Sequence, residues 1–374
     1  MAKIHRSWGW LAGALVAVSI SGSTLAWFAG DDNKHRSLTS KDQQDVARIT
    51  ANMKPTCVGR FVIDLPAEAE TELTAANVDG LSIVTGMESL PEFQKRLADR
   101  EAEFRAIPDR SGGDRNLETV TAVSTANGLI GKIFVHRRVV NEGTQANGLE
   151  IERYRYEGVA VDALVHGNGV SIELAADGYD PEHADKLAQL VTRLIPNPEN
   201  RIPPGSGFCV DYAYLSGLLS PDQGERITMR TSLTSHPDIE FMLMLAAGTA
   251  PDAKGLLDRS AEALKQMTFA DSARVTTLRA GRRVIGGLTG EEVVERIVER
   301  KALVLDSFWW EARGTADDVL NPHVSFTMDT GISGQKPVPA ALSDSGAILL
   351  WDRISSSIRL LPSESRPGSR RTAS

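Results

Sequence analysis

The residues that could carry catalysis or bind a metal are few and widely spaced. Five of the histidines have no spacing typical of metal ligands, and no Cys-x-x-Cys, His-Glu-x-x-His or phosphate-binding loop occurs. The nearest match to a hydrolase nucleophile elbow, Gly331–Gln335, lacks the final glycine and lies among prolines. We therefore predict a chain that catalyses no reaction and needs no metal or cofactor. The five histidines are His136, His166, His183, His236 and His323.

Two aspartates, Asp64 and Asp211, each follow a cysteine by a few residues. A pair of carboxyl groups could act as general acid and base. Aspartates near strands more often cap a strand end or pair with a nearby arginine, such as Arg60. We therefore expect both aspartates to have structural roles.

Cys57 and Cys209 are the two cysteines, and they lie in similar stretches, CVGRFVIDLP and GFCVDYAYL. A disulfide between them would need an oxidising compartment and Cα atoms within about 7 Å. Alternatively, each is a small buried side chain in its own core. The similarity of the stretches favours separate cores, because copies of one buried position carry the same residue without touching. The first stretch is therefore expected to be a core strand.

A run of aromatic residues, Phe308-Trp309-Trp310, is the main candidate for a binding surface. If it forms a strand with alternating faces, at least one ring must leave the core side. Glu311, Asp317 and Asp318 follow it, and an exposed tryptophan beside acids is typical of a protein-binding hot spot. The alternative is that one tryptophan fills the core and the other packs under the following loop.

The N-terminal residues predict export. Basic residues precede an apolar run, Trp8–Ala29, that contains no charged side chain. Thr24–Ala26 resembles a signal-peptide cleavage site, although the run is also long enough to span a membrane. Either way the following chain leaves the cytoplasm, so we predict a periplasmic protein that touches a membrane only through such an anchor.

The net charge of −8 argues against a nucleic-acid partner, because phosphate binding requires clustered Lys and Arg. It is compatible with a basic protein partner or simply with solubility.

The order of predicted elements occurs twice. After each cysteine come a second strand, an amphipathic helix, several strands and a closing helix. The helices are expected over residues 91–107 and 180–195 in the first copy, and over 252–267 and 345–361 in the second. This agreement of order is stronger evidence for a duplication than any single motif.

The fold expected is α+β, with two duplicated domains, each a mainly antiparallel sheet with helices packed on one face. Proline and glycine crowd residues 197–207, which marks the boundary between the domains. The predicted segments are 1–30, signal peptide or membrane anchor; 31–54, linker; 55–198, N-terminal domain; 205–362, C-terminal domain; and 363–374, disordered tail.

The stretches Cys57–Pro66 and Gly207–Asp211, together with the ending Leu360-Leu361-Pro362, resemble the fourth class of Tle-cognate immunity proteins. That family neutralises lipase effectors of type VI secretion. The resemblance covers most of the exported chain and implies a periplasmic protein of two domains that holds a phospholipase toxin inactive. It implies no catalytic residues. The rival interpretation is a non-catalytic envelope scaffold with another periplasmic partner, whose gene need not lie beside a lipase-like gene.

Overall fold

The computed structural model describes residues 38–361, apart from 109–114, 149, 218–222, 249, 300–302, 317 and 335. The predicted export segment, residues 1–30, and the predicted tail, residues 363–374, lie outside the described residues. Within the described part, no helix is both long enough and apolar enough to cross a membrane.

The N-terminal half begins with a short helix and a β-hairpin. Its longest helix, α2, starts at a capping box in which Ser89 and Glu92 satisfy each other's backbone N–H groups. Its elements are α1 (Ser40–Ile49), β1 (Met53–Val58), β2 (Phe61–Pro66), β3 (Ala69–Val78), β4 (Leu81–Met87), α2 (Leu90–Ala106), β5 (Leu117–Ser124), β6 (Ile130–Asn147), β7 (Glu150–Gly167), β8 (Val170–Tyr179), the 3-10 helix η1 (Pro181–His183), α3 (Ala184–Arg193) and β9 (Leu194–Pro196).

The C-terminal half repeats this order of elements, beginning again with a β-hairpin. Its elements are β10 (Gly207–Val210), β11 (Ala213–Ser216), β12 (Glu225–Leu233), β13 (His236–Ala247), α4 (Leu256–Gln266), α5 (Phe269–Ser272), β14 (Val275–Ile285), β15 (Leu288–Val298), β16 (Val304–Ala312), β17 (His323–Thr330), β18 (Ile332–Ser333), β19 (Lys336–Pro337), α6 (Asp344–Ser355) and β20 (Arg359–Leu360).

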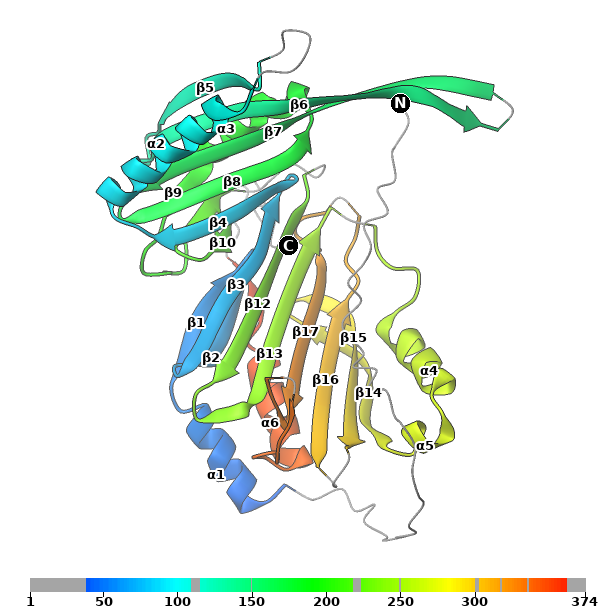
Figure 1. Ribbon diagram of the computed structural model, residues 1–374. Coiled ribbons are helices and arrows are strands. Elements are labelled where there is room, and N and C mark those ends of the chain that lie inside the picture. The colour runs from blue at the N-terminus through cyan, green and yellow to red at the C-terminus, as the bar shows by residue number, and fades with distance from the viewer. Residues whose placement is uncertain are drawn as a thin grey trace, which may run out of the picture. The chain divides into compact units, whose positions relative to one another are not determined.

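One antiparallel sheet of 12 strands runs through both halves, in the order β14-β15-β16-β17-β13-β12-β3-β4-β8-β7-β6-β5 (Figure 1). Read outward from the central β3–β12 pair, both halves place equivalent strands in the same sequence. The mainly antiparallel α+β fold and its duplication are therefore confirmed, as an approximate two-fold relation between the halves. The sequence does not predict that β3 pairs with β12 and so unites the two sheets into one.

The halves also exchange their last strands. β9, at the end of the N-terminal half, pairs with β11 of the C-terminal half, and β20 pairs with β2 of the N-terminal half. Between the two hairpins, Gly59 and Cys209 exchange backbone hydrogen bonds of 2.8 and 3.0 Å. Arg60 and Glu225, both almost completely buried, form an ion pair that also crosses between the halves. The two cores are thus tied together at the centre of the fold.

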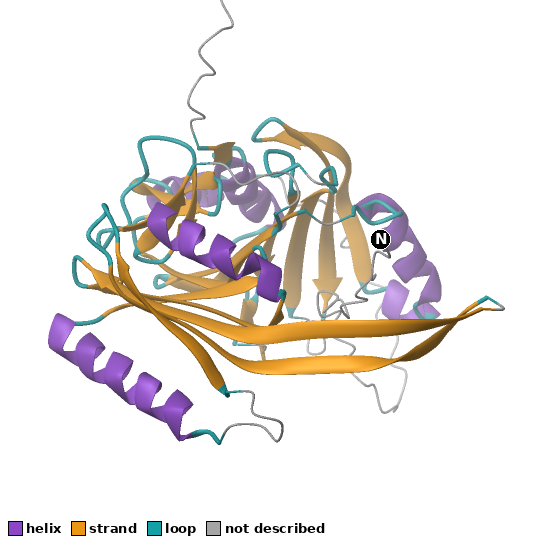
Figure 2. Ribbon diagram, turned by 90° about the horizontal axis from the view of Figure 1, so that it is seen from above, coloured by secondary structure: helices purple, strands orange, loops and turns teal. Residues whose placement is uncertain are grey.

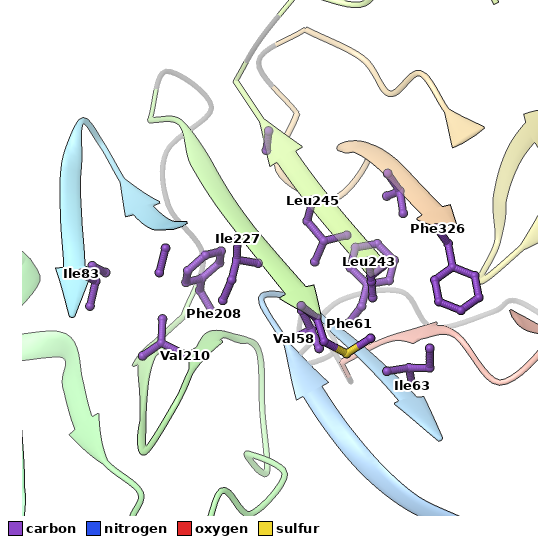
Figure 3. Close-up of a cluster of buried hydrophobic side chains, with 14 of the residues drawn as sticks. Val58, Phe61, Ile63, Ile83, Phe208, Val210, Ile227, Leu243, Leu245 and Phe326 are labelled. Atoms are coloured by element: carbon purple, nitrogen blue, oxygen red, sulfur yellow. The ribbon is translucent and has the colours of Figure 1, made fainter. Parts of the chain in front are cut away.

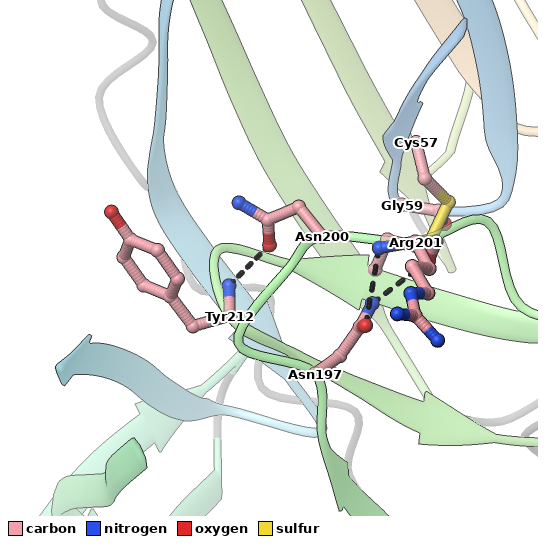
Figure 4. The surroundings of a disulfide bond; sticks show 7 residues. Cys57, Gly59, Asn197, Asn200, Arg201 and Tyr212 are labelled. Atoms are coloured by element: carbon pink, nitrogen blue, oxygen red, sulfur yellow. Dashed lines mark hydrogen bonds between the residues drawn. A yellow bond between two sulfur atoms is a disulfide. The ribbon is translucent and has the colours of Figure 1, made fainter. Parts of the chain in front are cut away.

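Cys57 and Cys209 are joined by a disulfide whose Cα atoms lie 5.8 Å apart (Figure 4). The expectation that they lie apart in separate cores is therefore wrong. Both cysteines occupy the residue one before the last residue of the first strand in their hairpin. The two hairpins meet where the halves meet, so equivalent positions come into contact.

The helices lie on both faces of the sheet, whereas the sequence predicted one face in each domain. In the N-terminal half, the Phe104 ring of α2 contacts Phe134 of β6, and alternate residues of β7 belong to the separate core that includes α3. Figure 2 shows a helix on each side of these strands. In the C-terminal half, α6 packs Trp351 on Phe308, while Arg259 of α4 reaches Trp309 on the other face. Strand alternation explains the arrangement, because both faces of these strands carry apolar residues.

The main core lies on the side of the sheet that carries the two hairpins, α1, α3 and α6. Val58 and Phe61 of the first hairpin and Phe208 of the second are buried together with Ile227 and Leu243 of the central strands (Figure 3). This single core holds both halves together. The opposite side of the central strands does not belong to this core.

Candidate protein-binding surface

Trp309 and Trp310 point to opposite faces of β16. Trp310 is completely buried in the main core, and its Nε1 donates a hydrogen bond of 3.0 Å to the carbonyl oxygen of Arg283. Trp309 is half-buried on the other face, where its Nε1 donates to Ser325 Oγ at 2.9 Å. The guanidinium of Arg259 lies 5.8 Å from the Trp309 ring centre. Of the two tryptophans, Trp309 is therefore the one placed to meet a partner.

Glu311 is not an exposed acid. Its side chain is 3% exposed, and one carboxylate oxygen, Oε2, accepts a hydrogen bond of 2.5 Å from Arg259. The other oxygen, Oε1, is buried and has no hydrogen-bond partner among the described residues. The rigid pairing with Arg259 makes Glu311 part of the support for α4 as well as part of the face that carries Trp309.

Of the two aspartates in the loop after β16, the described one is not fully exposed. Asp317 lies outside the described residues. Asp318 is half-buried, and its carboxylate accepts a hydrogen bond of 3.0 Å from the backbone N–H of Leu320, which closes a turn. A cavity of about 630 Å³ lies beside this loop and is lined by Glu291, Glu311 and Leu320, among others. Of the four predicted residues that the structure describes, Trp310 and Glu311 are buried, whereas Trp309 and Asp318 are half-buried.

Four of the described strands, β17, β13, β12 and β3, have no helix packed across the face that bears Trp309, and β16 is contacted on that face by the Arg259 side chain of α4. In the described residues, α2 contacts β6 and β7, and α4 contacts β15. Strands β16, β17, β13, β12 and β3 lie between them in the sheet, and in Figure 1 no helix lies in front of them, although the short strand β18 contacts β13. We call this face of the five strands the open face. Its middle row contains Met242, Thr327 and Trp309, which lie opposite one another on adjacent strands and are all half-buried, and it continues on β12 with the exposed Arg230 opposite Met242.

The row next to the middle row is acidic and continues from the open face onto β15. Glu240 lies opposite Asp329, Asp329 opposite Ser307, and Ser307 opposite Glu295. No Lys or Arg of the described segments forms an ion pair with these three acids. Burial raises the pKa of Asp329, and the negative charge of Glu240 raises it further, although a hydrogen bond from Ser307 lowers it. Burial also raises the pKa of Glu295.

A two-stranded ribbon, residues 139–147 of β6 and 150–158 of β7, extends beyond the strands that flank it. Pairing with β5 ends at His136, and pairing with β8 ends at Val159. We call this ribbon the arm; Figure 2 shows it projecting from the sheet. Ile151 is 78% exposed, and Tyr154 is 44% exposed. An isolated hairpin gains little stability by itself and leaves both edges unpaired, which suits binding to another chain.

The remaining candidates have structural partners. Asp64 pairs with Arg359 at 3.0 Å, and Asp211 accepts a hydrogen bond of 3.1 Å from the backbone N–H of Leu73. Burial raises the pKa of Asp211. The partner of Arg60 is Glu225 rather than either aspartate. The expected structural roles of both aspartates agree with these contacts.

The histidines are dispersed. His136 contacts Asp162 at 2.6 Å and stacks on Phe104, whereas His166 stacks on Phe93 beneath α2. Burial lowers the pKa of His323. No group of three or more His, Cys, Asp or Glu side chains in the described residues could hold a metal ion.

Sequence reasoning missed the methionines of the open face and the arm. The usable signal for the face was the alternation in 240–245, where Glu240, Met242 and Met244 alternate with the buried Phe241, Leu243 and Leu245. For the arm it was the length of the two paired strands, 18 residues each, which is about three times that of an ordinary strand.

Family models match most of the chain. The N-terminal domain of Tle cognate immunity protein 4 matches residues 54–186, and the C-terminal domain matches residues 201–363. No curated protein matches the chain.

Solved structures are similar over nearly their whole length. The apo structure of the immunity protein TplEi of the T6SS from Pseudomonas aeruginosa is 24% identical, with a TM-score of 0.66, and the match covers 83% of this chain and 98% of that one. TplEi complexed with "L" peptide is 24% identical, with a TM-score of 0.63 and coverage of 83% and 99%. A chain of the Tle4–Tli4 complex is 22% identical, with a TM-score of 0.66 and coverage of 84% and 99%. Because the two family models together span well over half of its length, this chain belongs to the Tle cognate immunity protein 4 family.

Proposed function

We propose that this chain is a periplasmic immunity protein that binds a phospholipase toxin of type VI secretion and holds it inactive. The single observation that carries the proposal is the match of both family domains, in the expected order, across the chain. The protein would act by binding alone, without catalysing a reaction. The apolar N-terminal run would direct it to the periplasm, where the toxin would otherwise reach the membranes of the producing cell.

Both halves of the molecule would take part in binding. The open face lies on the strands of the C-terminal half and on β3, while the arm belongs to the N-terminal half. Together they would cover the entrance to the toxin's active site or hold its lid. The complex must outlast the toxin's access to lipid, so we expect an interface of at least standard size, about 1,600 Å², and slow dissociation.

The test is to look for a lipase-like gene beside the gene of this chain and to co-express its product with this chain, both directed to the periplasm. We expect survival with the chain, lysis without it, and co-purification of a complex that hydrolyses no phospholipid. The isolated chain should hydrolyse none either. If the toxin kills cells equally with and without the chain, and no complex forms, the proposal is wrong and a scaffold with another partner is favoured.

A further inference from the structure

We propose that the open face receives a segment of the toxin that carries lysine or arginine side chains beside apolar ones. The inference rests on the proposed function, because it names the chemistry of the same partner. It is carried by the charges and by the row of apolar side chains on this face.

The acidic row is unusual for a structural surface. Glu240 and Asp329 lie directly opposite each other on β13 and β17, an arrangement that destabilises a sheet when both groups are charged. Glu295 continues the row on β15. In the part of the chain that the structure describes, none of the three pairs with a Lys or Arg, although surface acids elsewhere in the chain commonly do. Arg230 lies on the same face, but in the next row and opposite Glu72 on β3. The hydrogen bond from Ser307 to Asp329 offsets part of this repulsion. Acids left without a cationic partner are expected where a binding partner supplies the positive charge.

Glu311 gives an independent indication on the same face. Its side chain is 3% exposed, and its Oε1 has no donor among the described residues, while Oε2 is held by Arg259. A buried carboxylate oxygen without a donor is costly. Glu311 lies two residues from Trp309 on β16 and also lines the cavity of about 630 Å³. A cationic N–H group approaching from this side would satisfy it.

The middle row supplies the apolar part of the surface. Met242, Thr327 and Trp309 are half-buried and adjacent, and Met244 lies two residues further along β13. Methionine adapts its shape to an irregular partner surface, and tryptophan is enriched at the centres of interfaces. The segment that binds here should therefore place apolar side chains over this row and cationic ones over the acidic row.

A toxin fits this face better than the other occupants do. A second copy of this chain would bring its own acidic row to the contact, and each copy carries a net charge of −8. The first described helix, α1, packs against α6 on the opposite side of the sheet, so the described chain begins away from the open face.

The test compares two variants with the same change of charge. Glu240→Gln with Asp329→Asn removes two acids from the open face. The control, Asp99→Asn with Glu103→Gln, removes two exposed acids from α2 in the other half. Binding of each protein to the toxin identified by the co-expression test is measured by titration calorimetry at several salt concentrations. Thermal unfolding and oligomeric state are measured on the same samples.

We expect the open-face variant to bind at least about tenfold more weakly than wild type at moderate salt, with a shallower dependence on salt. Its melting temperature should be equal or higher, because the opposed carboxylates repel each other. The control should differ little from wild type. A purely structural role for these acids predicts the opposite, a lower melting temperature.

Glu295→Gln is the second variant, since it leaves the β13–β17 pair untouched, and it should weaken binding in the same direction. Unchanged affinity and salt dependence in both variants of the acidic row would overturn the inference, as would a wild-type dimer that the double variant dissociates. Loss of protection by the wild-type chain itself would instead count against the proposed function.

Discussion

The disulfide between Cys57 and Cys209 is expected to be a major part of the stability of this protein. The two residues are 152 positions apart, so the bond closes a very long loop in the unfolded chain. The chain-entropy relation gives about 5 kcal/mol for a loop of this length, whereas measured contributions of disulfides are typically 2–4 kcal/mol. We therefore expect a loss of about 3–5 kcal/mol of unfolding free energy when the bond is absent.

The location of the bond argues for the upper part of that range. It joins the two hairpins at the place where the halves meet, and both cysteines are buried, in a small cluster with Val62 and Leu361. The backbone bridge between Gly59 and Cys209 and the buried Arg60–Glu225 pair lie beside it. These contacts already hold the hairpins in the bonded geometry, so closing the bond should require little rearrangement of the native state.

The measurement is urea unfolding of the wild type with and without a reducing agent, followed by tryptophan fluorescence and far-ultraviolet circular dichroism. The variant Cys57→Ala with Cys209→Ala is unfolded under both conditions. It should match the reduced wild type apart from the small loss of packing by the two sulfur atoms, and the reducing agent should not affect it. A change below about 1 kcal/mol on reduction of the wild type would refute the reasoning, because loop closure would then not govern stability. Separate transitions of the two probes would show that the halves unfold independently once the bond is cut.

Three further predictions concern charge and the arm. Burial, with the negative charge of Asp344 nearby, raises the pKa of Asp306 to about 7 from 3.8, so the folded state binds the proton more tightly than the unfolded state. The unfolding free energy of the wild type should therefore fall as the pH rises from 4 towards 8, by about 4 kcal/mol at most, and Asp306→Asn should remove that part of the pH dependence in denaturation curves. Arg60→Met should cost about 3–5 kcal/mol in the same assay, because Glu225 would remain buried without its partner, and adding Glu225→Gln should restore part of it. Replacing residues 141–156 of the arm by a two-residue turn should leave the melting temperature within a few degrees of wild type but weaken toxin binding; unchanged binding would exclude the arm from the interface.

Local pattern was enough to predict the order of elements but not their long-range pairing. The amphipathic period of residues 91–107 places α2 within a residue of its observed bounds, Leu90–Ala106. The pairing of β3 with β12 depends on contacts between chain segments more than a hundred residues apart, and no periodicity reports it. The alternation of Trp309 and Trp310 was predictable, whereas which of them faces the core depends on which side α6 packs.

The repeat of the cysteine stretches is real, but the conclusion that Cys57 and Cys209 lie apart is wrong. The two stretches were rightly identified as copies, and copies of a buried position normally lie far apart. Cys57 and Cys209 are an exception because the approximate two-fold relation brings equivalent hairpins together. Positions near such an axis meet their own copies, and a duplicated cysteine there becomes a disulfide.

Where the two halves differ is itself evidence about function. The equivalents of β6 and β7 in the second half are β15 and β16, which have 11 and 9 residues against 18 each, so the arm exists in one half alone among the described elements. The equivalent helices differ as well: α2 buries Phe93 and Phe104 against the sheet, whereas in α4 Leu256 is the buried residue. Neither difference is needed for folding, because the C-terminal half folds without the long ribbon and the N-terminal half folds with its helix packed closely on the sheet. One half carries a projecting ribbon and the other a face of sheet that no helix covers, and the proposed binding of a toxin from two sides would use both.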